Sequence, residues 1–139
     1  MVKITDIYYK IWVDCLVRMR AQEANANNWK EKSMIAMSIA MTCKFFILMT
    51  IFERYVVGSL FYEINISFLS EGVNDILSIL LLFFLPCVII NYLLIFRKKK
   101  YEKLIEKYPY HNGKLAATYI VLSIALPVAL VLIGAFLLQ

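Results

Sequence analysis

Three long apolar segments constrain this chain more than any other feature. Residues 76–96 and 115–138 carry no charged side chain over 21 and 24 positions, and residues 33–52 carry one, Lys44. About 20 apolar residues in an α-helix, rising about 1.5 Å each, cross a hydrocarbon core about 30 Å thick. The sequence therefore predicts an all-α integral membrane protein with three transmembrane helices at these positions.

Composition favours the same class and offers little catalytic chemistry. Hydrophobic residues make up 62% of the chain, against roughly half in soluble domains. Cys15, Cys43 and Cys87 lie far apart and His111 is the single histidine, so we expect neither a metal site nor a disulfide framework. The sequence contains no nucleophile motif and no glycine-rich phosphate loop, and we expect no enzymatic activity and no cofactor.

The distribution of charge predicts how the segments are oriented. Residues 1–32 hold six basic and four acidic side chains, residues 97–114 hold seven and two, and residues 53–75 hold one and four. Cytoplasmic loops carry the excess of lysine and arginine. We therefore predict a multi-pass protein of the inner (plasma) membrane with a cytoplasmic amino terminus, an extracytoplasmic loop at 53–75, a basic cytoplasmic hairpin at 97–114 and an outside carboxy terminus.

Residues 1–28 are predicted to form a cytoplasmic amphipathic helix ahead of a transmembrane bundle over 29–139. Apolar side chains recur in it at spacings of three and four, the pattern of a helix with one apolar face. They are Ile4, Ile7, Tyr8, Ile11, Cys15 and Met19. Asp14 falls on another face, where it can pair with Arg18 one turn later. Two interpretations stay open: a helix lying on the inner membrane surface or against the cytoplasmic hairpin, and an element of oligomerisation or gating.

Lys44 is the residue that most needs an explanation. On a helix over 33–52 it shares one stripe with Met37 and Ala40, and small side chains let neighbouring helices approach closely. A lysine at the centre of a bilayer costs at least about 2.5–3.5 kcal/mol on insertion scales, so such residues usually face an interior, a partner or water. We predict that Lys44, Ala40 and Met37 line a pore or form a buried polar position.

A second register for the first span also stays open. A span over residues 45–62 would make Lys44 an interfacial residue whose amine reaches the headgroups. That register would bury both Glu53 and Arg54. Two charged side chains at the centre of the bilayer cost more free energy than one unless they pair, so we favour residues 33–52.

A basic run follows the second apolar segment directly. Such a cluster attracts anionic lipid at roughly 1 kcal/mol for each basic side chain near the surface. With the nearby Tyr108 and Tyr110 it could also cradle phosphates and stack bases, which would suit a cytoplasmic nucleotide or oligonucleotide ligand, or a protein regulator. The candidate contacts for an anionic ligand or lipid are Arg97, Lys98, Lys99, Lys100 and Tyr101.

Prolines occupy the middle of the second and third apolar segments. Pro86 and Pro127 each free the carbonyl four residues earlier. They form either two independent kinks or a shared hinge that lets a bundle open.

The layout of a short cytoplasmic helix and several spans joined by a basic inner hairpin resembles the small membrane effectors of bacterial anti-phage systems of the Hailong and Kiwa type. The resemblance covers the layout and no diagnostic residue. It implies a self-assembling protein, such as a channel, controlled from the cytoplasm.

These observations lead to one expected function and two alternatives. Three helices cannot enclose a pore, so we predict a homo-oligomer, with a tetramer as the working hypothesis, that forms a gated ion channel. A ring of Lys44 side chains would favour anions. The first alternative is a non-conducting accessory or scaffold subunit whose Lys44 pairs with a carboxylate of another protein. The second is a membrane-surface sensor of anionic lipid that uses the basic hairpin.

Overall fold

The computed structural model describes residues 2–22, 27–58 and 64–137, which form helices joined by turns without any strand. Parts of the predicted segments 1–28, 53–75 and 115–138 fall outside these ranges.

Three helices are long and apolar enough to cross a membrane, and each predicted span lies on one of them. Their extents are Trp29–Val57, Glu71–Lys107 and Lys114–Leu137. The first comprises α2 (Trp29–Phe52) and a π-helical turn (Glu53–Val57) that ends at Gly58, whose φ is 73°. The third is the single helix α6 (Lys114–Leu137).

The second long helix is irregular around its proline. It runs through α3 (Glu71–Ile79), a π-helical turn (Leu80–Phe84), α4 (Leu85–Asn91) and a second π-helical turn (Tyr92–Phe96). Pro86 stands at the start of α4. Its ring offers no N–H to the preceding turn and crowds the carbonyl there, and the wider π-helical turn directly before it takes up this misfit.

The chain turns sharply after Phe96. A short 3₁₀ turn (Arg97–Lys99) places Lys98 and Lys99 at φ 56° and 54°, and α5 (Lys100–Lys107) follows. The left-handed conformation costs residues other than glycine roughly 1–2 kcal/mol each, so the packing of α5 must impose this turn. Pro109 follows α5 and prevents its continuation.

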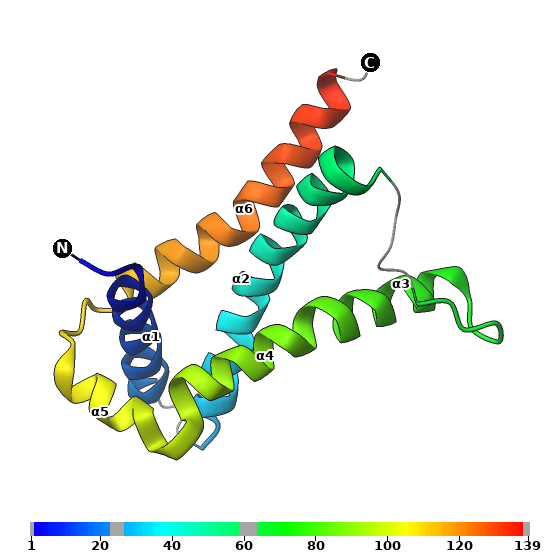
Figure 1. Ribbon diagram of the computed structural model, residues 1–139. Helices are drawn as coiled ribbons and strands as arrows, with labels where there is room; N and C mark the ends of the chain where they lie inside the picture. The colour runs from blue at the N-terminus through cyan, green and yellow to red at the C-terminus, as the bar shows by residue number, and fades with distance from the viewer. Residues whose placement is uncertain (1, 23–26, 59–63, 138–139) are drawn as a thin grey trace.

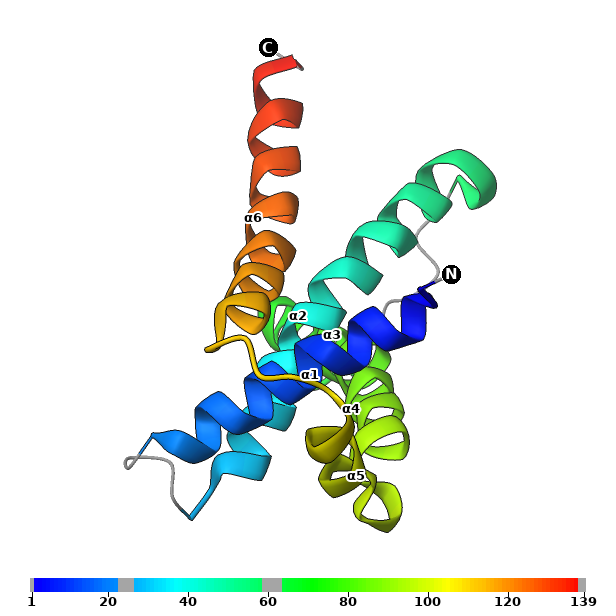
Figure 2. The same cartoon turned by 90° about the vertical axis from the view of Figure 1, so that its left-hand side faces the viewer.

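The long helices diverge from one end of the molecule. Figure 1 shows α2 between α4 and α6, and α2 packs against both. The first helix, α1 (Ile4–Ala21), crosses the others at the end where they converge (Figure 2) and contacts α2, α5 and α6. The main core lies there and consists of Trp12, Val13, Cys15, Leu16, Met37, Ile95, Tyr101, Leu104, Tyr108 and Ala116. We call this region the α1 end.

Candidate functional site

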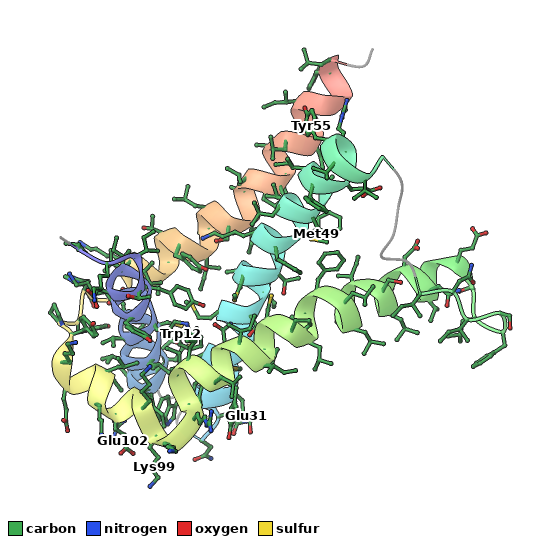
Figure 3. All side chains as sticks on the ribbon, viewed as in Figure 1. Trp12, Glu31, Met49, Tyr55, Lys99 and Glu102 are labelled. Carbon is green, nitrogen blue, oxygen red and sulfur yellow. The ribbon has the colours of Figure 1, made fainter. Side chains whose placement is uncertain are left out.

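The middle of α1 is enclosed on all sides. Residues 12–16 are buried without interruption, whereas a helix lying on a surface buries one stripe. Figure 3 shows Trp12 pointing into the space between α1 and the other helices. Ile4 and Ile7, which belong to the predicted apolar stripe, are 86% and 50% exposed. Full burial in α1 is therefore confined to its central turns, and α2, α5 and α6 contact this helix.

Asp14 fixes α1 to the start of α6. Its side chain is fully buried, and its two oxygens accept four backbone hydrogen bonds. Oδ1 accepts from the amides of His111 and Gly113 at 2.8 and 3.0 Å. Oδ2 accepts from the amides of Leu115 and Ala116 at 2.9 and 3.2 Å. The carboxylate thus satisfies free N–H groups in the first turn of α6, where the helix dipole also favours a negative charge.

The turn that Asp14 holds has a shape that few residues allow. Asn112 and Gly113 have φ values of 58° and 76°. A Cβ atom at Gly113 would lie 2.9 Å from Cγ of Arg18. The expected position of Asp14 on an outer face, paired with Arg18, is therefore wrong: the carboxylate faces backbone amides nearly a hundred residues away in the sequence, and the arginine stem packs over the turn.

A second polar contact joins α1 to α4 and α2. The hydroxyl of Tyr8 donates to Oδ1 of Asn91 at 2.6 Å, and Nδ2 of Asn91 donates to Oγ of Ser38 at 3.1 Å. Asn91 and Ser38 are fully buried. A buried side-chain amide is costly unless it is hydrogen-bonded, so this triad fixes how the three helices fit together.

Lys44 lies beside this triad, on the side of α2 that meets α6. Its Nζ atom stands 3.5 Å from the centre of the Tyr119 ring. The rings of Tyr119 and Tyr8 form an edge-to-face pair with a centroid distance of 6.2 Å. Lys44 itself is half-buried. Met37 and Ala40 are fully buried, so in this arrangement they contact helices of their own chain and face no lumen.

The two prolines are not brought together. Pro86 lies on α4 and Pro127 on α6, with α2 between these helices (Figure 1). Pro127 lines an apolar groove of about 300 Å³ between α2 and α6 that also includes Arg54. A shared hinge remains a prediction.

The basic run is divided by the turn at Arg97–Lys99. A pocket of about 400 Å³, which we call the basic pocket, is lined by Leu93, Arg97, Lys98, Lys100 and Lys103. Lys99 is not among the lining residues and points away from the bundle in Figure 3. Of the four basic residues predicted as contacts, Arg97, Lys98 and Lys100 therefore line the pocket and Lys99 does not.

The fifth predicted contact, Tyr101, lies in the interior. Its ring packs against Trp29 and Phe96 at centroid distances of 5.8 and 5.7 Å, and Nζ of Lys30 lies 4.9 Å from its centre. Tyr108 is also buried, and only Tyr110 of the three tyrosines near the basic run is exposed. Stacking of a base on Tyr101 would require this core to open.

Several ionisable groups of the α1 end respond to their surroundings. The hydroxyl of Tyr108 donates to Oδ1 of Asp6 at 2.7 Å, which lowers the pKa of Asp6 and raises the pKa of Tyr108.

Burial raises the pKa of the Cys15 thiol to about 11, so the thiol stays protonated at neutral pH. All three cysteines are free, and the described residues contain no group of three or more His, Cys, Asp or Glu that could hold a metal ion.

Three residues that matter at the α1 end were not predicted as site residues. Asp14 and Asn91 are buried hydrogen-bonding residues, and Lys103 lines the basic pocket. For Asp14 the available signal was a carboxylate among apolar neighbours, and for Asn91 it was an amide within an apolar run. The hydrogen-bond partners of both residues lie far away in the sequence, so the sequence pattern could not identify either as a site residue.

Comparison with known proteins adds no assignment. A scan against protein-family models found no matching family, and searches of curated proteins and of solved structures found no similar chain. The fold thus defines the protein as a helical chain with three helices that could span a membrane.

Proposed function

We propose that the protein inserts into a membrane, assembles with copies of itself and forms a gated ion channel in which Lys44 faces the ion pathway. The position of Lys44 carries the proposal. It lies near the middle of the Trp29–Val57 helix, is half-buried, and meets the ring of Tyr119 with no carboxylate beside it among the described residues. An ammonium group at such a depth needs water, an anion or a partner.

The exposed surface of the long helices supports self-assembly. Ala116 and Ser123 are the only buried residues in the described part of α6, and α4 and α6 diverge on either side of α2 (Figure 1). A single chain of this shape encloses no pathway. Packing α6 or α4 against neighbouring copies would place several Lys44 amines around one axis, where they would attract anions.

The docking of α1 supports a gate. α1 is tied to the start of α6 through Asp14 and to α4 through Tyr8 and Asn91. Tyr8 also meets Tyr119, the residue on which Lys44 stacks. Movement of α1 would therefore change the contacts that hold Lys44, and we place this gate, with the basic hairpin, on the cytoplasmic side.

Ion flux in liposomes tests the assignment of Lys44. Lys44→Met keeps an unbranched side chain of similar length and removes its charge, and Lys44→Arg keeps the charge. We expect Lys44→Met to lose the preference for anions and Lys44→Arg to retain it. Lys114→Met, which removes an exposed charge at the α1 end, is the matched control. Unchanged flux and selectivity in Lys44→Met would show that Lys44 does not line the pathway.

The same lysine supports a second candidate, a non-conducting accessory subunit. In that case a carboxylate on a helix of another protein would pair with Lys44. Purification from the native host with Lys44 intact and with Lys44→Ala separates the two functions. Loss of one specific partner protein in Lys44→Ala would favour the accessory subunit over the channel.

The resemblance of the layout to anti-phage membrane effectors suggests phage infection as the setting. We propose that the channel opens in infected bacteria and stops phage multiplication. Plaque formation on the native host, with the wild-type protein and with Lys44→Met, tests this role. Equal plaque numbers with the wild-type protein and without the protein would contradict it.

A further inference from the structure

The basic pocket brings four positively charged side chains together. Arg97, Lys98 and Lys103 are exposed, and none has a hydrogen-bond or ion-pair partner among the described residues. Lys100 is held in place, because its Nζ donates to the hydroxyl of Tyr9 at 2.9 Å and lies 4.8 Å from the centre of the Tyr9 ring. Four cations around one small pocket repel one another unless an anion enters.

The backbone of the pocket is held in a costly shape. Lys98 and Lys99 both have left-handed φ values, and they form the turn that brings Arg97 toward α5. Such conformations persist only where the surrounding structure imposes them, and they cluster at functional sites. Here the strained turn separates two adjacent lysines, one lining the pocket and one pointing away.

The neighbours of the pocket indicate which anion it takes. Leu93 forms one wall and is 48% exposed, and it continues into the apolar surface of α4 through residues such as Ile89 and Ile90. An apolar surface that ends in a ring of cations matches a lipid whose chains lie along the helix and whose phosphate lies at the helix end. The nearby rings of Tyr101 and Tyr108 are buried, and no aromatic side chain is among the described residues that line the pocket.

We infer that the basic pocket binds the phosphate of an anionic phospholipid headgroup, with Arg97, Lys98 and Lys103 as its ligands. The acyl chains pass Leu93 along α4. This site depends on membrane insertion, but it does not depend on the assembly of several copies or on a role of Lys44 in conduction.

The two adjacent lysines provide a matched test. Full-length protein is reconstituted in phosphatidylcholine bilayers that contain phosphatidylglycerol as a minor component, and incorporation is verified first so that failed insertion is recognised separately. Native mass spectrometry then counts the phosphatidylglycerol retained by each chain. Lys98→Asn and Lys99→Asn remove the same charge, and asparagine tolerates the left-handed conformation that both positions require.

We expect Lys98→Asn to lower phosphatidylglycerol binding about fivefold, the effect of roughly 1 kcal/mol for one cation, and Lys99→Asn to leave it unchanged. Arg97→Gln with Lys103→Gln should remove the remaining retention. Equal losses in Lys98→Asn and Lys99→Asn would overturn the site, since they would reflect attraction to surface charge alone.

A second arm distinguishes a lipid phosphate from a soluble one. Wild-type protein in pure phosphatidylcholine is titrated with inorganic phosphate and with ATP. We expect no saturable binding of either probe. Saturable binding that Lys98→Asn abolishes would show that the pocket takes a soluble phosphate, and it would overturn the assignment to lipid.

Discussion

The two ends of the molecule differ in how far their side chains are buried and in which segments their hydrogen bonds join. At the α1 end, Asp14, Asn91 and Ser38 are buried and Tyr8 is partly buried, and all four make hydrogen bonds between helices. At the other end, which comprises residues 45–58, 64–82 and 124–137 and which we call the open end, only Asn74 and Ser78 are buried among the described residues. Both bond within their own segment, to residues 64–66.

This difference shows which parts of the fold a single chain can specify. Hydrogen bonds fix α1 against α4 and α6, and apolar contacts fill the spaces around them. The open end instead exposes large apolar side chains such as Leu48, Leu126 and Val131. In the function proposed above, lipid or neighbouring copies would cover that surface, because exposed apolar side chains are costly in water.

The largest effect is expected from Asp14→Asn at the α1 end. The substitution places an N–H group among four buried backbone amides, and we expect it to destabilise the fold by at least about 3 kcal/mol. In a Cys43→Ala/Cys87→Ala background, the buried Cys15 should then react with a thiol reagent at neutral pH. Thermal unfolding in detergent and the rate of labelling measure the two effects.

Asp75→Asn at the open end is the matched control for that substitution. Asp75 is exposed, so neither the unfolding temperature nor the labelling of Cys15 should change. Equal effects of the two substitutions would remove the contrast between the ends.

An intermediate effect is expected from Asn91→Leu. The substitution leaves Tyr8 and Ser38 without their partner, and we expect a loss of about 1–3 kcal/mol together with faster labelling of Cys15. Asn74→Leu, the same change at the open end, should loosen only residues 64–66. If Asn74→Leu exposed Cys15 as much as Asn91→Leu does, the triad would not be what holds α1.

The smallest effect is a dependence on pH at the surface of the α1 end. The hydrogen bond from Tyr108 lowers the pKa of Asp6 in the folded protein, so the ionised Asp6 adds to the free energy of unfolding at neutral pH. This contribution is lost as the pH falls below about 4, through the lowered pKa. The unfolding temperature of the wild type should therefore fall more steeply between pH 5 and 3 (roughly the range of carboxylate titration) than that of Tyr108→Phe. Parallel curves would contradict this assignment.

The sequence predicted the long helices better than it predicted their packing. The three apolar helices follow from run length alone. The left-handed pair Lys98 and Lys99 could not be foreseen, since lysine disfavours that conformation and only the docking of α5 imposes it.

The candidate site was predicted only in part, for a related reason. Lys44 was singled out because a charge in an apolar run is visible locally, and its role as a site residue stays a prediction. The sequence pattern pairs Asp14 with Arg18 four residues later. In the fold its hydrogen-bond partners lie beyond residue 110, where a local pattern cannot find them. Met37 and Ala40 share a helical stripe with Lys44, but burial of that stripe depends on where α1 docks.

The mass of the detergent-solubilised protein tests the proposed function most directly. Native mass spectrometry compares it with the chain mass of 16.2 kDa. A channel predicts one discrete closed assembly of about four copies or more, as symmetric oligomers form, in which Lys44→Met leaves the mass unchanged and alters ion selectivity. A clean monomer under conditions that keep Cys15 protected would contradict a pore built from copies of this chain.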